Sequence, residues 1–187
     1  TLVAAPDLLH QQTTPSGDRQ WSNIVHVALE ISSGSATIAH VHVIGGVHIH
    51  GPRSRPLLEW LVVSHASIGF SVHHHAAPLI RDAVIHSVGT GIDATQGATL
   101  NVLRVEVTNV TFSGAVFSAA ARVRMKWSSI MHAGLTALAA TDSAVIDASS
   151  CAIHHAAQTG ILLERGAGGT LDRIDVFRAG FAGVELR

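Results

Sequence analysis

The chain has 187 residues, of which 47% are apolar and only 13% are charged, and its 12 Lys and Arg nearly balance its 13 Asp and Glu. This length suits a single domain with a sizeable core. The near-zero net charge argues against a general nucleic-acid surface. The sequence contains no run of 18 apolar residues, so no transmembrane segment is predicted. The single cysteine excludes an internal disulfide framework.

Residues 1–20 do not follow the pattern of the rest of the chain. They contain Pro6 and Pro15, and the second proline leads into the turn-like sequence Ser16-Gly17-Asp18. We therefore expect residues 1–20 to form an N-terminal cap or an extended arm.

Residues 21–187 contain a repeat with a period of about 23 residues, which is in the range typical of solenoids. Each repeat has a short apolar strand, a polar residue that is often His, a small-residue turn and a second apolar strand. The polar centres of the seven repeats are His42, His65, His86, Asn109, His132, His155 and Arg178. The second apolar positions are Val47, Phe70, Ile92, Val116, Leu138, Ile161 and Val184. Two sets of positions that recur together in all seven repeats indicate a solenoid.

The repeat has the pattern of β-structure. Its apolar runs are short, rich in β-branched residues and alternate with period two, as in Val41-His42-Val43. We predict an all-β fold, a right-handed parallel β-helix of about seven turns, in which turns stack at ~4.8 Å. Residues 183–187 form a strand pattern without a cap, so we expect a segment of a larger protein whose ends abut flanking domains.

The pattern apolar-x-apolar-x-x-(Asn/His)-x-x-Gly-(Ile/Val) resembles the right-handed parallel β-helix proteins of the pectin-lyase-like superfamily, over residues 21–187. Asn109 matches the position at which that family stacks asparagines as an internal ladder. Histidines replace asparagine at His42, His65, His86, His132 and His155. The resemblance implies either an enzyme acting on polysaccharides or a non-enzymatic surface protein, and the fold alone does not choose between them.

The histidine column has two interpretations, a hydrogen-bonded structural ladder inside a bend or a metal site. Asn109-Val110-Thr111 is also a glycosylation sequon. An inward ladder asparagine could not be glycosylated, so the structural interpretation argues against modification of Asn109.

A second group of histidines is predicted on an outer face. Alternation places His48 and His50 on one side of a strand, with His73 on the same face of the next turn. Imidazoles at this spacing can hold Zn²⁺ or Cu²⁺. The alternative is a solvated, histidine-rich surface.

A third group is an outward column in which aromatic and basic residues predominate. It is expected to contain Thr37, Trp60, Arg81, Arg104, Trp127, Ser150 and Arg173. Exposed tryptophan rings stack on sugar rings and arginine binds carboxylates, so with Glu106 nearby this column suits a glycan. The alternative is an ordinary surface on which the arginines pair with Glu106 or Asp175.

The catalytic motifs of the family's hydrolases, epimerases and lyases are absent from the sequence, including the clustered carboxylates that glycoside hydrolysis needs. We therefore expect a non-catalytic extracellular, cell-surface or periplasmic module that presents an elongated surface to a glycan or to another protein chain. One alternative is an enzyme on acidic polysaccharide that uses Arg81, Arg104 and Glu106. The other is metal handling at His48, His50 and His73, and only this alternative requires a cofactor, Zn or Cu.

Overall fold

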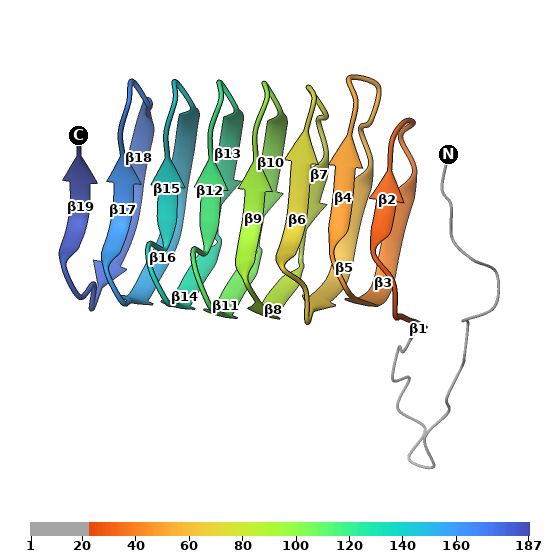
Figure 1. The fold of residues 1–187 in the computed structure, drawn as a ribbon, viewed down its shortest axis with the longest axis horizontal. Coiled ribbons are helices and arrows are strands. Elements are labelled where there is room, and N and C mark those ends of the chain that lie inside the picture. The colour runs from red at the N-terminus through yellow and green to blue at the C-terminus, as the bar shows by residue number, and fades with distance from the viewer. Residues whose placement is uncertain (1–22) are drawn as a thin grey trace, which may run out of the picture.

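The computed structural model describes residues 23–187, which form a rod of stacked parallel strands with about seven turns (Figure 1). Every strand pairing joins neighbouring turns in parallel, and paired residues such as Lys126 and Ser149 are roughly 23 residues apart in sequence. The predicted all-β parallel solenoid is therefore confirmed. The cap or arm predicted for residues 1–20 lies outside the described residues.

Each turn contributes to three faces of the rod. We number these faces in the order in which the chain passes through them within a turn. The third face is an eight-stranded sheet and is drawn in front in Figure 1. Its strands are β2 (Leu29–Ile31), β4 (Val47–His50), β6 (Ile68–His73), β9 (Thr90–Ala94), β12 (Ala115–Phe117), β15 (Leu138–Ala140), β17 (Thr159–Leu163) and β19 (Ala182–Leu186).

The first and second faces form one eleven-stranded sheet, because four long strands continue around the corner between them. These long strands are β3 (Thr37–Ile44), β5 (Leu57–Ser64), β16 (Val145–Ala156) and β18 (Gly168–Phe177). The first face also holds β7 (Leu79–Arg81), β10 (Thr99–Leu103) and β13 (Arg122–Lys126). The second face also holds β1 (Asn23–Val25), β8 (Val84–Val88), β11 (Glu106–Val110) and β14 (Ser129–Ala133).

Two corners of the rod are made by residues in the left-handed backbone region. The first corner column, between the first and second faces, consists of His40, Trp60, Asp82, Arg104, Trp127, Ser150 and Arg173, with φ between 50 and 57°. The second corner column precedes the third face and consists of His65, Ser87, Asn109, His132, His155 and Arg178, with φ between 52 and 57°. Positive φ is uncommon for residues other than glycine, so its repetition turn after turn shows that the bend belongs to the fold.

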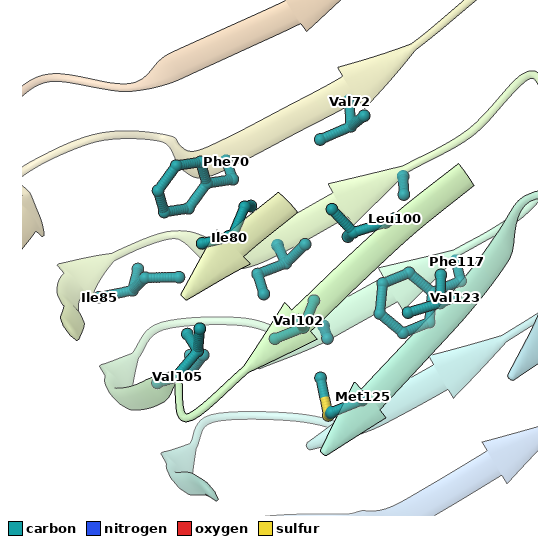
Figure 2. Close-up of a cluster of buried hydrophobic side chains, with 14 of the residues drawn as sticks. Phe70, Val72, Ile80, Ile85, Leu100, Val102, Val105, Phe117, Val123 and Met125 are labelled. Carbon is teal, nitrogen blue, oxygen red and sulfur yellow. The ribbon is translucent and has the colours of Figure 1, made fainter. Parts of the chain in front are cut away.

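The core is a continuous stack of apolar side chains inside the rod (Figure 2). Phe70 and Phe117 of the third face are fully buried in this core, as are Ile80 and Leu100 of the first face.

One inward column of the core runs along the third face. It consists of Val47, Phe70, Ile92, Ala115, Leu138 and Ile161. The second apolar positions predicted from the repeat are confirmed in these turns with one exception. There, Ala115 faces inward and Val116 does not. Val184 continues the register from Ile161 but is exposed in the last turn.

The glycine that precedes this inward column is required by close packing between turns. A Cβ atom on Gly91 would lie 2.3 Å from the carbonyl oxygen of Gly114 in the next turn. Real Cβ atoms do not approach an oxygen so closely, so the Gly-(Ile/Val) pattern of the repeat reflects contact of one backbone with the next.

Candidate ligand-binding surface

The first corner column exposes two large aromatic side chains. Trp60 is 54% exposed and Trp127 is 61% exposed, and they lie three turns apart on the same corner. At ~4.8 Å per turn, their backbones are about 14 Å apart along the rod. Trp60 stacks on His40 with ring centres 6.1 Å apart and nearly parallel planes, whereas Trp127 has no ring partner among residues 23–187.

The predicted column needs two corrections, both in the first turns, where the intervals between corner residues differ from the predicted ones. Arg81 pairs in register with Leu103, and Asp82 takes the corner position in that turn. His40 takes the corner position in the first turn, where the prediction had Thr37. Trp60 follows the first corner residue by 20 residues and precedes the third by 22, whereas the predicted column has intervals of 23 and 21, so the predicted alignment misplaced these two turns.

The two arginines expected to bind a glycan are engaged within the protein. The Arg104 guanidinium donates to both carboxylate oxygens of Asp82, from Nε to Oδ1 at 2.6 Å and from Nη2 to Oδ2 at 2.8 Å. This hydrogen bonding lowers the pKa of Asp82. Arg81 forms an ion pair with Glu59 of the preceding turn, in which Nε and Nη2 both donate to Oε2. Both guanidinium groups are therefore already neutralised by carboxylates.

A row of positive charges without ion pairs in the described part of the chain lies instead on β13. Its residues Arg122, Arg124 and Lys126 alternate with buried Val123 and Met125, so the three cationic side chains share the outer surface of the first face. Within residues 23–187, none of the three forms an ion pair. We call these three residues the basic row. Sequence reasoning missed it, although the alternation in Arg122-Val123-Arg124-Met125-Lys126 is a clear strand signal with one charged face.

Neighbouring strands supply polar groups on both sides of the basic row. Arg124 is in register with Asn101 of β10 and with Asp147 of β16. A shallow depression of about 190 Å³ is bordered by all three. A second depression, of about 250 Å³, adjoins it and includes Lys126. Asp147 makes no ion pair within the described range, so the row keeps a net positive charge, and Trp127 follows directly at the corner.

The remaining residues predicted for the glycan site are not gathered around Trp127. Arg173 is exposed two turns further along the corner and pairs with Asp172 at 3.0 Å. Glu106 lies past the corner on the second face, in register with Val84 and Ser129. The enzyme alternative thus combines two paired arginines with a carboxylate on another face.

The histidine column is also rearranged. His42 and His86 lie on the second face, where His86 is in register with Ser64, and are not members of the second corner column. That column faces outward, and Asn109 in it is exposed, so the expected internal ladder is wrong. Stacking does occur between His132 and His155, whose ring centres are 4.8 Å apart with a 13° interplanar angle.

The predicted metal ligands on the third face are only partly brought together. His50 is in register with His73, and their ring centres are 6.2 Å apart, but His48 is in register with Ser71. His50 Nε2 hydrogen-bonds to Glu30 Oε1 at 2.9 Å. Burial is the main cause of two pKa shifts here: it lowers the pKa of His73 and raises the pKa of Asp93 nearby. Across residues 23–187, no three His, Cys, Asp or Glu side chains are already placed to hold a metal ion.

The fold and this surface define a parallel β-solenoid with an aromatic and basic outer patch. Comparison with known proteins gives no match, whether to protein-family models, to curated proteins or to solved structures. Within residues 23–187, no helical segment has the length and hydropathy that crossing a bilayer requires.

Proposed function

We propose that this β-solenoid is a non-catalytic module that binds an extended acidic glycan at Trp127 and the basic row. The observation that carries the proposal is the juxtaposition of a 61% exposed tryptophan with three cationic side chains that have no ion-pair partner in residues 23–187. Aromatic rings that bind sugars and cations that bind carboxylates thus occur side by side on one surface.

The backbone at Trp127 supports a functional role for its side chain. Its φ of 50° lies in the left-handed region, which costs a bulky residue of the order of 1 kcal/mol relative to glycine or asparagine. A large apolar ring that is mostly exposed at such a position adds little to the core. The presence of tryptophan there is explained if the ring stacks on a ligand.

The charges of the basic row favour an acidic ligand over a neutral one. Alternate residues on a strand are about 6.7 Å apart, so Arg122 and Lys126 are separated by about 13 Å. Carboxylates repeated along a uronic-acid polymer can accept charge-assisted hydrogen bonds from such a row. The adjoining depressions provide polar contacts from Asn101 and Asp147 for hydroxyl groups.

The wider setting of this function follows from the resemblance of the repeat to pectin-lyase-like proteins. In that setting we propose an extracellular, cell-surface or periplasmic module whose elongated form presents the glycan site. Since Arg81 and Arg104 are paired with carboxylates, binding without turnover is the function that the surface supports best.

The test is binding of polygalacturonate, with dextran as the neutral polymer, measured by affinity electrophoresis and titration calorimetry. Two variants probe the site, Trp127→Asn and the double variant Arg124→Gln, Lys126→Gln. The matched control is Arg53→Gln, Arg55→Gln, which removes two exposed arginines between β4 and β5 that form no ion pair with the described residues.

We expect the charge variant to bind polygalacturonate roughly 10- to 100-fold more weakly, as loss of charged hydrogen bonds worth about 1.5–3 kcal/mol implies. The control should bind like the parent chain. No polygalacturonate binding by the parent chain, or equal loss in the control, would disprove the proposal. Appearance of unsaturated or reducing ends during the assay would show an enzyme in place of a binding module.

A further inference from the structure

A second polar cluster lies on the second face, several turns away from Trp127 and unused by the proposed glycan site. Its centre is Ser64, whose side chain is buried. The Ser64 hydroxyl oxygen is 2.8 Å from His42 Nε2 and 3.0 Å from His65 Nδ1. Two imidazole nitrogens from neighbouring turns therefore converge on one atom.

This convergence limits how far apart the two nitrogens can lie. Because both are bonded to the same oxygen, their separation cannot exceed the sum of the two hydrogen-bond lengths. A hydroxyl carries one proton, so it donates to one imidazole and accepts from the other. One of the two imidazole nitrogens thus directs a lone pair at Ser64.

His86, from the following turn, completes a triangle of rings. Its ring centre lies 6.4 Å from that of His42 and 6.5 Å from that of His65. A Zn–N bond of about 2 Å plus about 1.2 Å from nitrogen to ring centre puts each ring centre about 3.2 Å from the ion, so two ligating rings at a tetrahedral angle lie about 5.2 Å apart. The observed spacings are about 1.2 Å longer than this, so the site forms only when side-chain rotations bring the three rings closer together.

We infer that His42, His65 and His86 form a site for one divalent transition-metal ion, Zn²⁺ or Cu²⁺, which binds beside Ser64 Oγ when the three rings turn toward one point. His42 lies on β3, His86 on β8 and His65 at the corner directly after β5, so the paired strands fix their spacing. Three imidazoles leave a fourth position for water or the Ser64 hydroxyl, as in zinc sites with an open coordination position.

The protonation state of the cluster suits metal binding. Burial, followed by the nearby His86, His65 and His26, lowers the pKa of His42. The neutral imidazole is the form that ligates metals, so a depressed pKa reduces the competition from protons. Copper should bind more tightly than zinc, in keeping with the order of stability for nitrogen ligands.

This cluster differs from the metal site predicted from the sequence on the third face. There, His50 Nε2 already bonds to Glu30, and His48 lies beside Ser71 and not beside His73. On the second face, two nitrogens already point to one oxygen. The third ring, His86, must approach them by about 1 Å, and because its Nδ1 is hydrogen-bonded to Ser87 Oγ at 3.2 Å, its Nε2 is the atom that would reach the ion. The inference is independent of the proposed glycan binding, because the clusters share no residue.

The test measures Zn²⁺ and Cu²⁺ uptake by the whole chain, by titration calorimetry and by metal analysis after gel filtration. His86→Thr and His65→Asn remove one ligand each. The new residue types occur at the same positions of later turns, because Thr108 is in register with His86 and Asn109 holds the His65 position two turns later. His132→Asn is the matched control, because it lies in the second corner column outside the cluster. His73→Thr probes the third face.

We expect one equivalent of metal in the parent chain, in His132→Asn and in His73→Thr, and at least a tenfold loss of affinity in His86→Thr and His65→Asn. Thermal melts without metal show whether each variant is folded, and Co²⁺ absorption of the parent chain reports imidazole coordination directly. The inference is overturned if the parent chain takes up no metal, if neither ligand variant weakens uptake, or if only His73→Thr does.

Discussion

Arg104 holds the carboxylate of Asp82 through two hydrogen bonds, of 2.6 and 2.8 Å, between neighbouring positions of one corner column. The Asp82 side chain is only 11% exposed. A guanidinium that the sequence alone offers as a ligand-binding group is thus committed to a structural pair. The next turn of the same corner carries Trp127, so the pair borders the proposed glycan site.

Breaking this pair should strengthen binding of an acidic glycan. Asp82→Asn keeps a residue that tolerates the left-handed backbone but removes the charge that neutralises Arg104. We expect affinity for polygalacturonate to rise about three- to tenfold at low salt, and the gain to shrink as salt screens the exposed charge. Calorimetry at two ionic strengths measures both effects, and an unchanged affinity at low salt would count against a glycan path past Arg104.

The same variant should lose stability only in part of the pH range. The folded protein lowers the pKa of Asp82 below its ordinary value of 3.8, so its contribution is present above that value and is lost as pH falls through the lower folded pKa. At neutral pH we expect a small loss of stability, because solvent screens the half-exposed guanidinium. Urea unfolding at pH 7 and pH 3 should show a smaller difference at the lower pH, and a difference that grows in acid would contradict the assignment.

Trp127→Asn should separate stability from binding. Asparagine adopts a φ near +50° more readily than tryptophan, and little core contact is lost because the ring is 61% exposed. We expect unfolding free energy to stay within about 0.5 kcal/mol of the parent value or to rise. Affinity for polygalacturonate should fall about three- to tenfold, as loss of aromatic stacking worth about 0.5–1.5 kcal/mol implies.

A result in which Trp127→Asn melts well below the parent chain would assign the ring a structural role. Trp60→Asn offers a comparison at the same corner, since Trp60 stacks on His40 and lies beyond the basic row. Its effect on glycan binding should be smaller than that of Trp127→Asn. Equal effects would show that the glycan runs along the rod and reaches both rings.

The sequence was sufficient to predict the solenoid, because apolar residues must recur at the same place in each stacked turn to stay buried. The inward column from Val47 to Ile161 shows this recurrence. It was less reliable for the surface. The early turns differ in length from the predicted intervals, which displaced Arg81 by one position from the corner. Ion pairs such as Arg104 with Asp82 depend on contacts between turns, which no local sequence pattern reveals. The basic row was not predicted because its three charges lie along one strand, whereas the prediction compared equivalent positions of successive turns.

Close packing between turns makes Gly91 a sensitive position. An added Cβ would lie 2.3 Å from the Gly114 carbonyl oxygen and 2.4 Å from Val107 Cγ1. We expect Gly91→Ala to destabilise the chain by about 1–3 kcal/mol, the usual cost of overpacking. Gly168→Ala is the control, because nothing lies within 4 Å of its added Cβ. Chemical unfolding of both variants checks the prediction, and equal stability of the two would contradict it.

Three partly buried histidines should make the fold less stable in mild acid. The pKa values of His42, His73 and His155 all lie below the ordinary value of 6.5, in each case chiefly because burial disfavours the charged imidazole. For His155, the stacked His132 and the guanidinium of Arg178, which donates to His155 Nε2 at 3.1 Å, act in the same direction. Below pH 6.5 the unfolded chain therefore binds more protons than the folded one, so the free energy of unfolding falls as pH falls.

Thermal melts between pH 8 and pH 5 measure this acid sensitivity. We expect a flat region above about pH 7 and a decline below about pH 6.5, where the histidines of the unfolded chain take up protons. His155→Asn should flatten that decline, because asparagine fits the left-handed corner and does not titrate. Stability that stays constant or increases towards pH 5 would show that these imidazoles are not held neutral by the fold.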